Sequence, residues 1–178
     1  MAAGLLALTG HAQEMTNCLP RTDIEAFEAQ TNTVIVKAMS LINSINMSSG
    51  SISVRSKEST DVSTGRKLYG MLLEFTGNGD WRERAVVDYG ELDSMLDGID
   101  YLNKVTSDVT TLASFEAAYA TKSGFRVIAY SSRRQGNVQI FIQFDGDERI
   151  PLTSDQVSQF RDLVNAAKNA LDALQSGK

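Results

Sequence analysis

Residues 65–105 read GRKLYGMLLEFTGNGDWRERAVVDYGELDSMLDGIDYLNKV, and residues 136–174 read GNVQIFIQFDGDERIPLTSDQVSQFRDLVNAAKNALDAL. Each stretch has two strand-like runs joined by a Gly-rich or acidic turn and followed by a helical pattern. More strand-like segments precede each stretch. The order predicts an α+β fold with two antiparallel β-meander-plus-helix units, roughly (ββββα)2, which form one pseudo-symmetric domain over residues 13–178.

The first unit, at about residues 33–105, is preceded by a short helix. Thr22–Glu25 has the capping-box pattern, which predicts a helix that ends near Thr31. Thr33–Asn43 is rich in β-branched and apolar residues and predicts a buried strand. Ser51–Lys57 alternates apolar and polar residues, which predicts a strand with one buried face. The strand after Gly65 is expected to place four apolar side chains on one face, namely Tyr69, Met71, Leu73 and Phe75, and Trp81–Tyr89 completes the meander.

The second unit, at about residues 112–176, repeats this order. Its expected strands are Ser114–Lys122, Phe125–Arg133, Asn137–Phe144 and Arg149–Leu152. Each unit ends in a helix with one apolar stripe at three- and four-residue spacing. The stripes are Leu92, Met95, Leu96, Ile99 and Leu102 in the first helix, and Val157, Phe160, Leu163, Val164, Ala167, Leu171 and Leu174 in the second. The acidic residues off the first stripe are expected to face water, namely Asp93, Asp97 and Asp100.

Composition is that of a globular protein, with 178 residues of which 42% are hydrophobic and 22% charged. No apolar run approaches the roughly 20 residues that span a bilayer. The net charge of −5 gives the whole molecule no attraction to phosphate or to anionic lipid. The single cysteine, Cys18, excludes a disulfide framework within the chain and a cysteine-based metal site.

Residues 1–12 resemble the end of a secretory signal peptide. Leu5–Leu8 is a short apolar stretch, and Gly10 and Ala12 have the small-residue spacing of a cleavage site. The basic region and most of the apolar segment of such a signal are missing, so a flexible tail is the alternative. The pattern predicts a mature protein that starts near Gln13 and works outside the cytoplasm, in the periplasm or secreted.

Residues that carry chemistry are sparse. The only histidine is His11, so no histidine-based triad or zinc site can be built from the rest of the chain. No phosphate-binding Gly-rich motif is present. Asp145–Glu148 lacks the spaced oxygen donors of a calcium loop and is read as an acidic hairpin turn. We therefore expect a protein that is not an enzyme and that has no cofactor and no metal.

One charge pattern offers a candidate site, because the expected strands are basic and the helices carry the excess acid. The functional interpretation is a cationic sheet surface that binds a polyanion through phosphate contacts and aromatic stacking. The alternative is that outward strand positions must be polar and that Lys and Arg guard sheet edges. The candidate polyanion-binding residues are Arg55, Lys57, Arg66, Lys67, Arg126, Arg133 and Arg134.

The duplicated order of four strands and a helix resembles the Whirly-type fold, and a single unit resembles the transcriptional positive-cofactor fold. The segment RIPLTSDQVSQFRDL, residues 149–163, is similar in style to the strand-into-helix junction of these families. The resemblance covers most of residues 33–175 in topology. It implies a protein that binds single-stranded nucleic acid across its sheets. The chain has no Lys-Gly-Lys-Ala-type motif of the Whirly family, so no binding residue is carried over.

Two functions follow as hypotheses. The first is a non-enzymatic, exported bacterial module that binds a partner protein, an envelope component or a small ligand. The alternative is a protein that binds single-stranded nucleic acid or another polyanion through the basic strand residues. Under either hypothesis, the protein is expected to be a monomer or a homodimer without a transmembrane segment.

Overall fold

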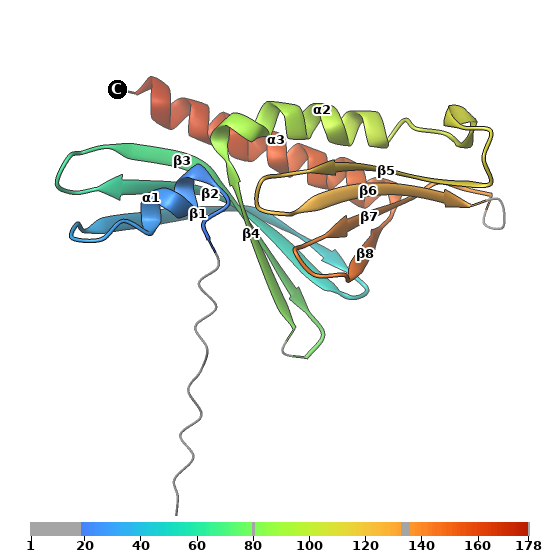
Figure 1. The fold of residues 1–178 in the computed structure, drawn as a ribbon, viewed down its shortest axis with the longest axis horizontal. Coiled ribbons are helices and arrows are strands. Elements are labelled where there is room, and N and C mark those ends of the chain that lie inside the picture. Colours follow the sequence, from blue (N-terminus) through green and yellow to red (C-terminus); the bar gives the residue numbers. More distant parts are fainter. Residues whose placement is uncertain (1–18, 80, 133–135, 178) are drawn as a thin grey trace, which may run out of the picture.

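The computed structural model describes residues 19–79, 81–132 and 136–177 (Figure 1). The strands form two four-stranded antiparallel sheets, ordered β1-β2-β3-β4 and β5-β6-β7-β8. The elements are α1 (Asp23–Glu28), β1 (Ile35–Met47), β2 (Gly50–Asp61), β3 (Lys67–Gly77), β4 (Arg82–Asp88), η1 (Tyr89–Glu91), α2 (Leu92–Leu102), η2 (Ser107–Val109), β5 (Ser114–Ala120), β6 (Arg126–Ser132), β7 (Gln139–Gln143), β8 (Arg149–Leu152) and α3 (Ser154–Ser176). The predicted α+β class with two meander-plus-helix units and a short N-terminal helix is confirmed.

Helix starts follow from local sequence. Thr22 is the N-cap of α1, where its side chain accepts a hydrogen bond from the Glu25 backbone and the Glu25 side chain accepts one from the Thr22 backbone. Thr153 and Gln156 make the same reciprocal pair at the start of α3. Both capping boxes satisfy backbone donors that a helix leaves unpaired in its first turn.

The β1–β4 sheet has one apolar face, which we call the inner face, and an opposite, more polar outer face. Val54 lies opposite Leu73 and Ile52 lies opposite Phe75 in the strand register, and all four side chains are buried. The expected shared face of β3 is confirmed, because Met71, Leu73 and Phe75 are buried there and Tyr69 packs at its margin. α1 covers part of the outer face, where Ile24 packs against β3 and β4.

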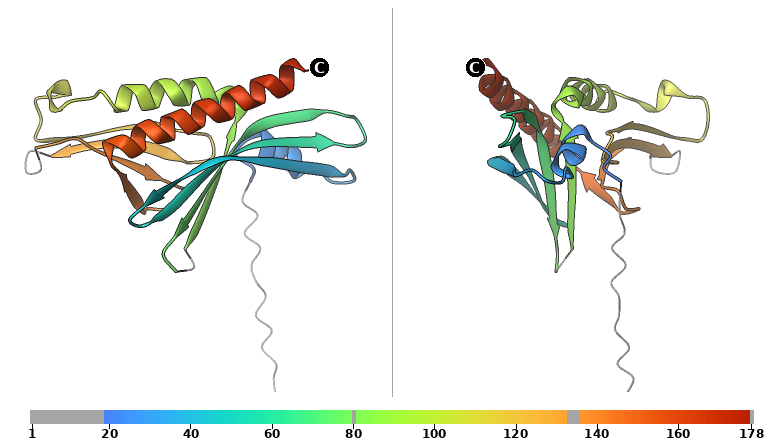
Figure 2. Two further views of the ribbon diagram at one scale, coloured as in Figure 1. Left: turned by 180° about the vertical axis from the view of Figure 1, so that it is seen from behind. Right: turned by 60° about the vertical axis from the view of Figure 1, so that its left-hand side comes forward.

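Each long helix packs on the sheet of the other unit. α2, which follows the first sheet, lies against β5 and β6, and α3, which follows the second sheet, lies against β1, β2 and β3 (Figures 1 and 2). Gly98 of α2 lets Tyr119 of β5 approach, since an added Cβ would lie 2.6 Å from the tyrosine ring. The two units are thus joined by exchanged helices.

The predicted apolar stripe of α2 is buried in full. In α3 five residues of the stripe are buried, namely Val157, Phe160, Val164, Ala167 and Leu171. Leu163 is half-buried, and Leu174, in the last turns of the helix, is half exposed. A single core therefore contains side chains from both sheets and both helices. Its centre is a set of aromatic contacts in which Phe144 lies 6.4 Å from Phe75 and 5.2 Å from Phe125, between ring centroids.

One sequence expectation about exposure is wrong. The segment Thr33–Asn43 is not buried, because β1 is an edge strand and most of its side chains face solvent. A β-bulge between Leu41 and Asn43 shifts the register and brings Ile45 into the core. Asp93, Asp97 and Asp100 lie off the stripe and reach solvent as expected, and Asp100, with 42% of its side chain exposed, also receives hydrogen bonds of 3.0 and 3.1 Å from the Arg161 guanidinium of α3.

Phe160 tests the burial of α3 in the shared core, because its side chain is 1% exposed and its ring lies 5.9 Å from that of Phe125. Phe160→Ala should lower the free energy of unfolding by about 3–5 kcal/mol, as buried aromatic truncations do. Leu174→Ala, at a half-exposed position of the same helix, should change it by less than about 1 kcal/mol. Urea unfolding followed by circular dichroism measures both. A Phe160→Ala loss as small as that of Leu174→Ala would contradict the shared core.

Candidate functional site

The residues predicted to bind a polyanion do not share one face. Arg55 and Lys57 lie on the outer face of the first sheet. Lys67 alternates in step with Leu73 and Phe75 of the same strand and so belongs to the inner face. Arg66 directly precedes β3, and Arg126 belongs to the second sheet. Arg133 and Arg134 lie outside the described residues, as do His11, Cys18 and the expected leader at residues 1–12.

Lys57 is the most buried of these cations, with 7% of its side chain exposed. Its Nζ lies 2.7 Å from Glu28 Oε1 of α1, and Lys37 Nζ of β1 lies 2.9 Å from Glu28 Oε2. Ser59 also donates a hydrogen bond to Glu28. Burial alone raises the pKa of Glu28, but the hydrogen bonds from Lys57, Ser59 and Lys37 outweigh it and hold the pKa below its ordinary value of 4.5. This cluster fastens α1 to the outer face.

The other described candidates have partners within the chain as well. Glu74 forms ion pairs with Arg55 and Arg84, each at 2.8 Å. Glu116 forms ion pairs with Arg126 at 3.7 Å and with Arg149 at 2.7 Å. Lys67 pairs with Glu58 at 2.8 Å, and the Arg66 guanidinium lies 5.4 Å from the centre of the Phe27 ring. A polyanion would therefore have to compete with carboxylates that already occupy most of these cations.

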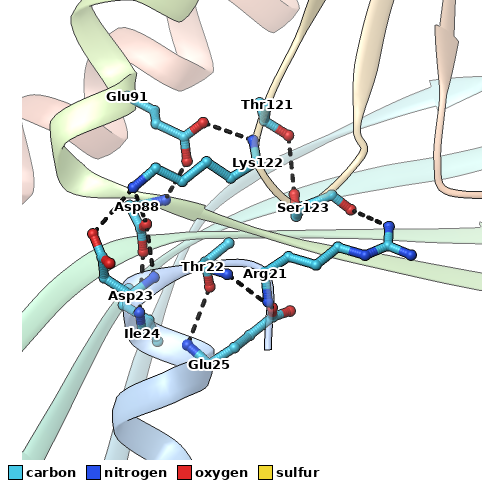
Figure 3. A network of polar contacts seen from close by, with 10 residues as sticks. All are labelled: Arg21, Thr22, Asp23, Ile24, Glu25, Asp88, Glu91, Thr121, Lys122 and Ser123. Atoms are coloured by element: carbon cyan, nitrogen blue, oxygen red, sulfur yellow. Dashed lines mark hydrogen bonds and ion pairs between the residues drawn. The ribbon is translucent and has the colours of Figure 1, made fainter. Parts of the chain in front are cut away.

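A polar junction around the buried Asp88 carboxylate joins α1 to both units (Figure 3). The Asp88 carboxylate, at the end of β4, accepts hydrogen bonds from the backbone of Asp23 at 2.9 Å and of Ile24 at 3.1 Å. It also lies 3.1 Å from Lys122 Nζ in the turn between β5 and β6. Hydrogen bonds to Asp23 and Asp88 raise the pKa of Lys122 well above its usual range. The Lys122 ammonium group thus links the turn between β5 and β6 to α1 and to the end of β4.

The exposed surface of β1 is the feature that sequence reasoning missed. Val36, Met39 and Leu41 are 50–52% exposed, and they are the large apolar side chains of the described strands that reach this exposure. β1 pairs only with β2 among the described strands, so its other edge has no strand neighbour (Figure 2). The apolar run within Thr33–Asn43 could not be assigned from sequence, because a buried central strand and an exposed apolar edge strand have the same local pattern.

Two other sheet edges carry features that discourage strand pairing. β8 is four residues long and contains Pro151, which has no backbone N–H to donate. β4 carries exposed Arg82 and Arg84 toward one end, and at the other end Asp88 is held by α1. Charge, proline and short length are the usual protections of an edge. β1 has 13 residues with Lys37 as its only charge and no proline.

The described residues contain no cluster of three or more His, Cys, Asp or Glu side chains that could hold a metal ion. No helix in the same part of the chain is long and apolar enough to cross a membrane. Comparison of the chain with family models, with curated proteins and with solved structures found no match. The resemblance to Whirly-type and positive-cofactor folds stays a prediction.

The Glu28 cluster gives a pH-dependent prediction. Because the pKa of Glu28 is lowered in the folded state, its carboxylate stabilises the fold above about pH 4.5, and this contribution is lost as the pH falls through the folded pKa. Glu28→Gln should lower the free energy of unfolding by about 1–3 kcal/mol at pH 7. The difference from the unsubstituted protein should shrink below pH 4.

Urea unfolding at pH 7 and at pH 3 measures this difference. Asp97→Asn, at an exposed position of α2, is the control and should have a small effect at both pH values. An equal loss for Glu28→Gln at both pH values would show that the charge of Glu28 contributes nothing.

Proposed function

We propose that this protein is a non-enzymatic, exported binding module that engages a protein partner by strand addition at the edge of β1. The observation that carries the proposal is the apolar exposure of Val36, Met39 and Leu41 on a strand whose second edge is unpaired among the described elements. An exposed strand edge presents a row of backbone donors and acceptors that an extended segment can complete.

The direction of the backbone groups of β1 follows from its register. The Val62 N–H donates to the Val34 carbonyl at 3.0 Å, so Val34 directs its backbone groups toward the β2 side. In antiparallel pairing this direction alternates along the strand. Ile35, Lys37, Met39 and Leu41 therefore direct their N–H and C=O groups away from β2. An added strand would bond to these residues and cover the side chains of Met39 and Leu41.

Other observations support the remaining parts of the proposal. The chain offers no histidine beyond His11, which favours binding over catalysis. The pairing of Arg55, Lys57 and Arg126 with carboxylates favours a protein partner over a polyanion. The pattern around Leu5–Leu8 supports export.

Export has its own test. Residues 1–12 lack the basic region of a signal peptide, so the test uses the gene with the sequence upstream of Met1 included. We expect the protein expressed from it, in a bacterium with an intact export system, to be recovered outside the cytoplasm with Gln13 as its first residue. N-terminal mass spectrometry after cell fractionation measures this. Replacing both Gly10 and Ala12 by Arg should block processing, because a cleavage site needs small residues at these positions. Recovery of an unprocessed chain from the cytoplasm alone would contradict export.

Strand addition is tested with linear peptides displayed on phage and selected on the immobilised protein. We expect selected peptides to alternate apolar and polar residues. They should bind the Met39→Lys variant at least tenfold more weakly, because a lysine at position 39 replaces one of the two exposed apolar side chains, Met39 and Leu41, that the peptide covers. Leu112→Lys is the matched control, since Leu112 is 74% exposed outside any strand. Isothermal titration calorimetry measures the affinities. Peptides that bind Met39→Lys as tightly as the unsubstituted protein would contradict the proposal.

A further inference from the structure

We infer that the strand which adds to β1 is β1 of a second copy, paired antiparallel about a two-fold axis that passes beside Ala38. This inference rests on the proposed function, because it names the partner of the same edge. It makes the protein a homodimer in which two first sheets become one continuous sheet.

The length of the straight part of β1 sets the position of the axis. The register with β2 is regular from Ile35 to Leu41 and shifts between Leu41 and Asn43. A bulge interrupts the ladder and increases the local twist, so Ile35–Leu41 is the longer of the two regular stretches of β1, the other being Asn43–Met47. The midpoint of Ile35–Leu41 is Ala38. An antiparallel pair centred there uses the whole stretch in both copies.

The backbone groups fit this axis. Ile35 faces Leu41 of the second copy and Lys37 faces its Met39, and these four residues direct their backbone groups toward the open edge. The two Ala38 residues form the pair on the axis, whose backbone groups point away from each other. Such pairs bring side chains closest together, with Cα atoms about 4.5 Å apart. The small alanine suits this position.

The side chains fit as well. On the outer face, Met39 of each copy lies beside Lys37 of the other and Leu41 lies beside Ile35, so each exposed apolar side chain gains a neighbour across the axis. Lys37 faces a methionine and not a second lysine, and its Nζ is already 2.9 Å from Glu28 of its own chain. An axis at Lys37 would oppose two like charges, which destabilises a cross-strand pair.

Preorganisation favours a second copy over a flexible peptide. β1 is already held extended by β2 over Ile35–Leu41. The backbone entropy of this stretch is therefore lost when the chain folds and not again when two copies meet. A flexible segment would lose that entropy on binding. Two copies also bring identical strands, which satisfies an isologous two-fold interface without a second protein.

The test is sedimentation equilibrium of the full chain over a wide range of concentrations. We expect a monomer–dimer equilibrium. Met39→Lys should raise the dimer dissociation constant at least tenfold, because it places two pairs of lysines opposite each other. Leu112→Lys should leave it unchanged. Circular dichroism and thermal unfolding confirm that each variant folds.

A double substitution tests the position of the axis. Lys37→Met combined with Met39→Lys restores one methionine opposite each lysine about Ala38, so it should recover most of the dimerisation that Met39→Lys loses. About an axis at Met39 the same double variant would oppose two lysines. A double variant as weak as Met39→Lys would overturn the Ala38 axis.

The remaining outcomes separate this inference from the proposed function. A dimer that Met39→Lys leaves intact would place the interface elsewhere and overturn the inference. A protein that is monomeric at all concentrations, and that still binds selected peptides through Met39, would overturn the second copy and leave strand addition standing. A monomer that binds no peptide at β1 would overturn both.

Discussion

The exchange of helices between the two units is the constraint on which the rest of the structure depends. The inner face of the first sheet is covered by α3, and β5 and β6 of the second sheet are covered by α2. Each helix can bury its apolar stripe only when the other unit is in place, since the core that contains Phe75, Phe125, Phe144 and Phe160 is continuous. The inner faces are therefore committed to folding, and binding is left to outer faces and edges.

The outer faces show why a basic composition of strands does not become a basic surface. Glu74 lies between Arg55 and Arg84, and Glu116 bridges Arg126 and Arg149. Opposite charges on neighbouring strands attract across the sheet, whereas like charges placed opposite each other would repel. A count of charges along the sequence records the excess of cations on strands, but the carboxylates that pair with them come from other strands and, for Lys37 and Lys57, from α1.

Local periodicity was sufficient for much of this fold. The stripe from Leu92 to Leu102, the shared face of Met71 and Leu73, and the capping boxes at Thr22 and Thr153 all depend on neighbours within a few residues. The position of β1 at an edge depends on strand order, which no local pattern specifies. The exchanged helices and the Asp88 junction likewise join segments distant in sequence, so neither could be predicted. The open edge of β1, the main element of the candidate site, was hidden for the same reason.

An open strand edge is a hazard as well as a binding surface, because repeated strand addition leads to fibres. The two edges of the first sheet differ in a way that limits such growth. Arg82 and Arg84 place exposed charges along β4, and α1 is fastened at its far end through Asp88. The bulge after Leu41 shortens the straight stretch of β1. Pairing through β1 would join two first sheets at their open edges, and the outer edges of that joined sheet would be the charged β4 strands, so this sheet would not grow further.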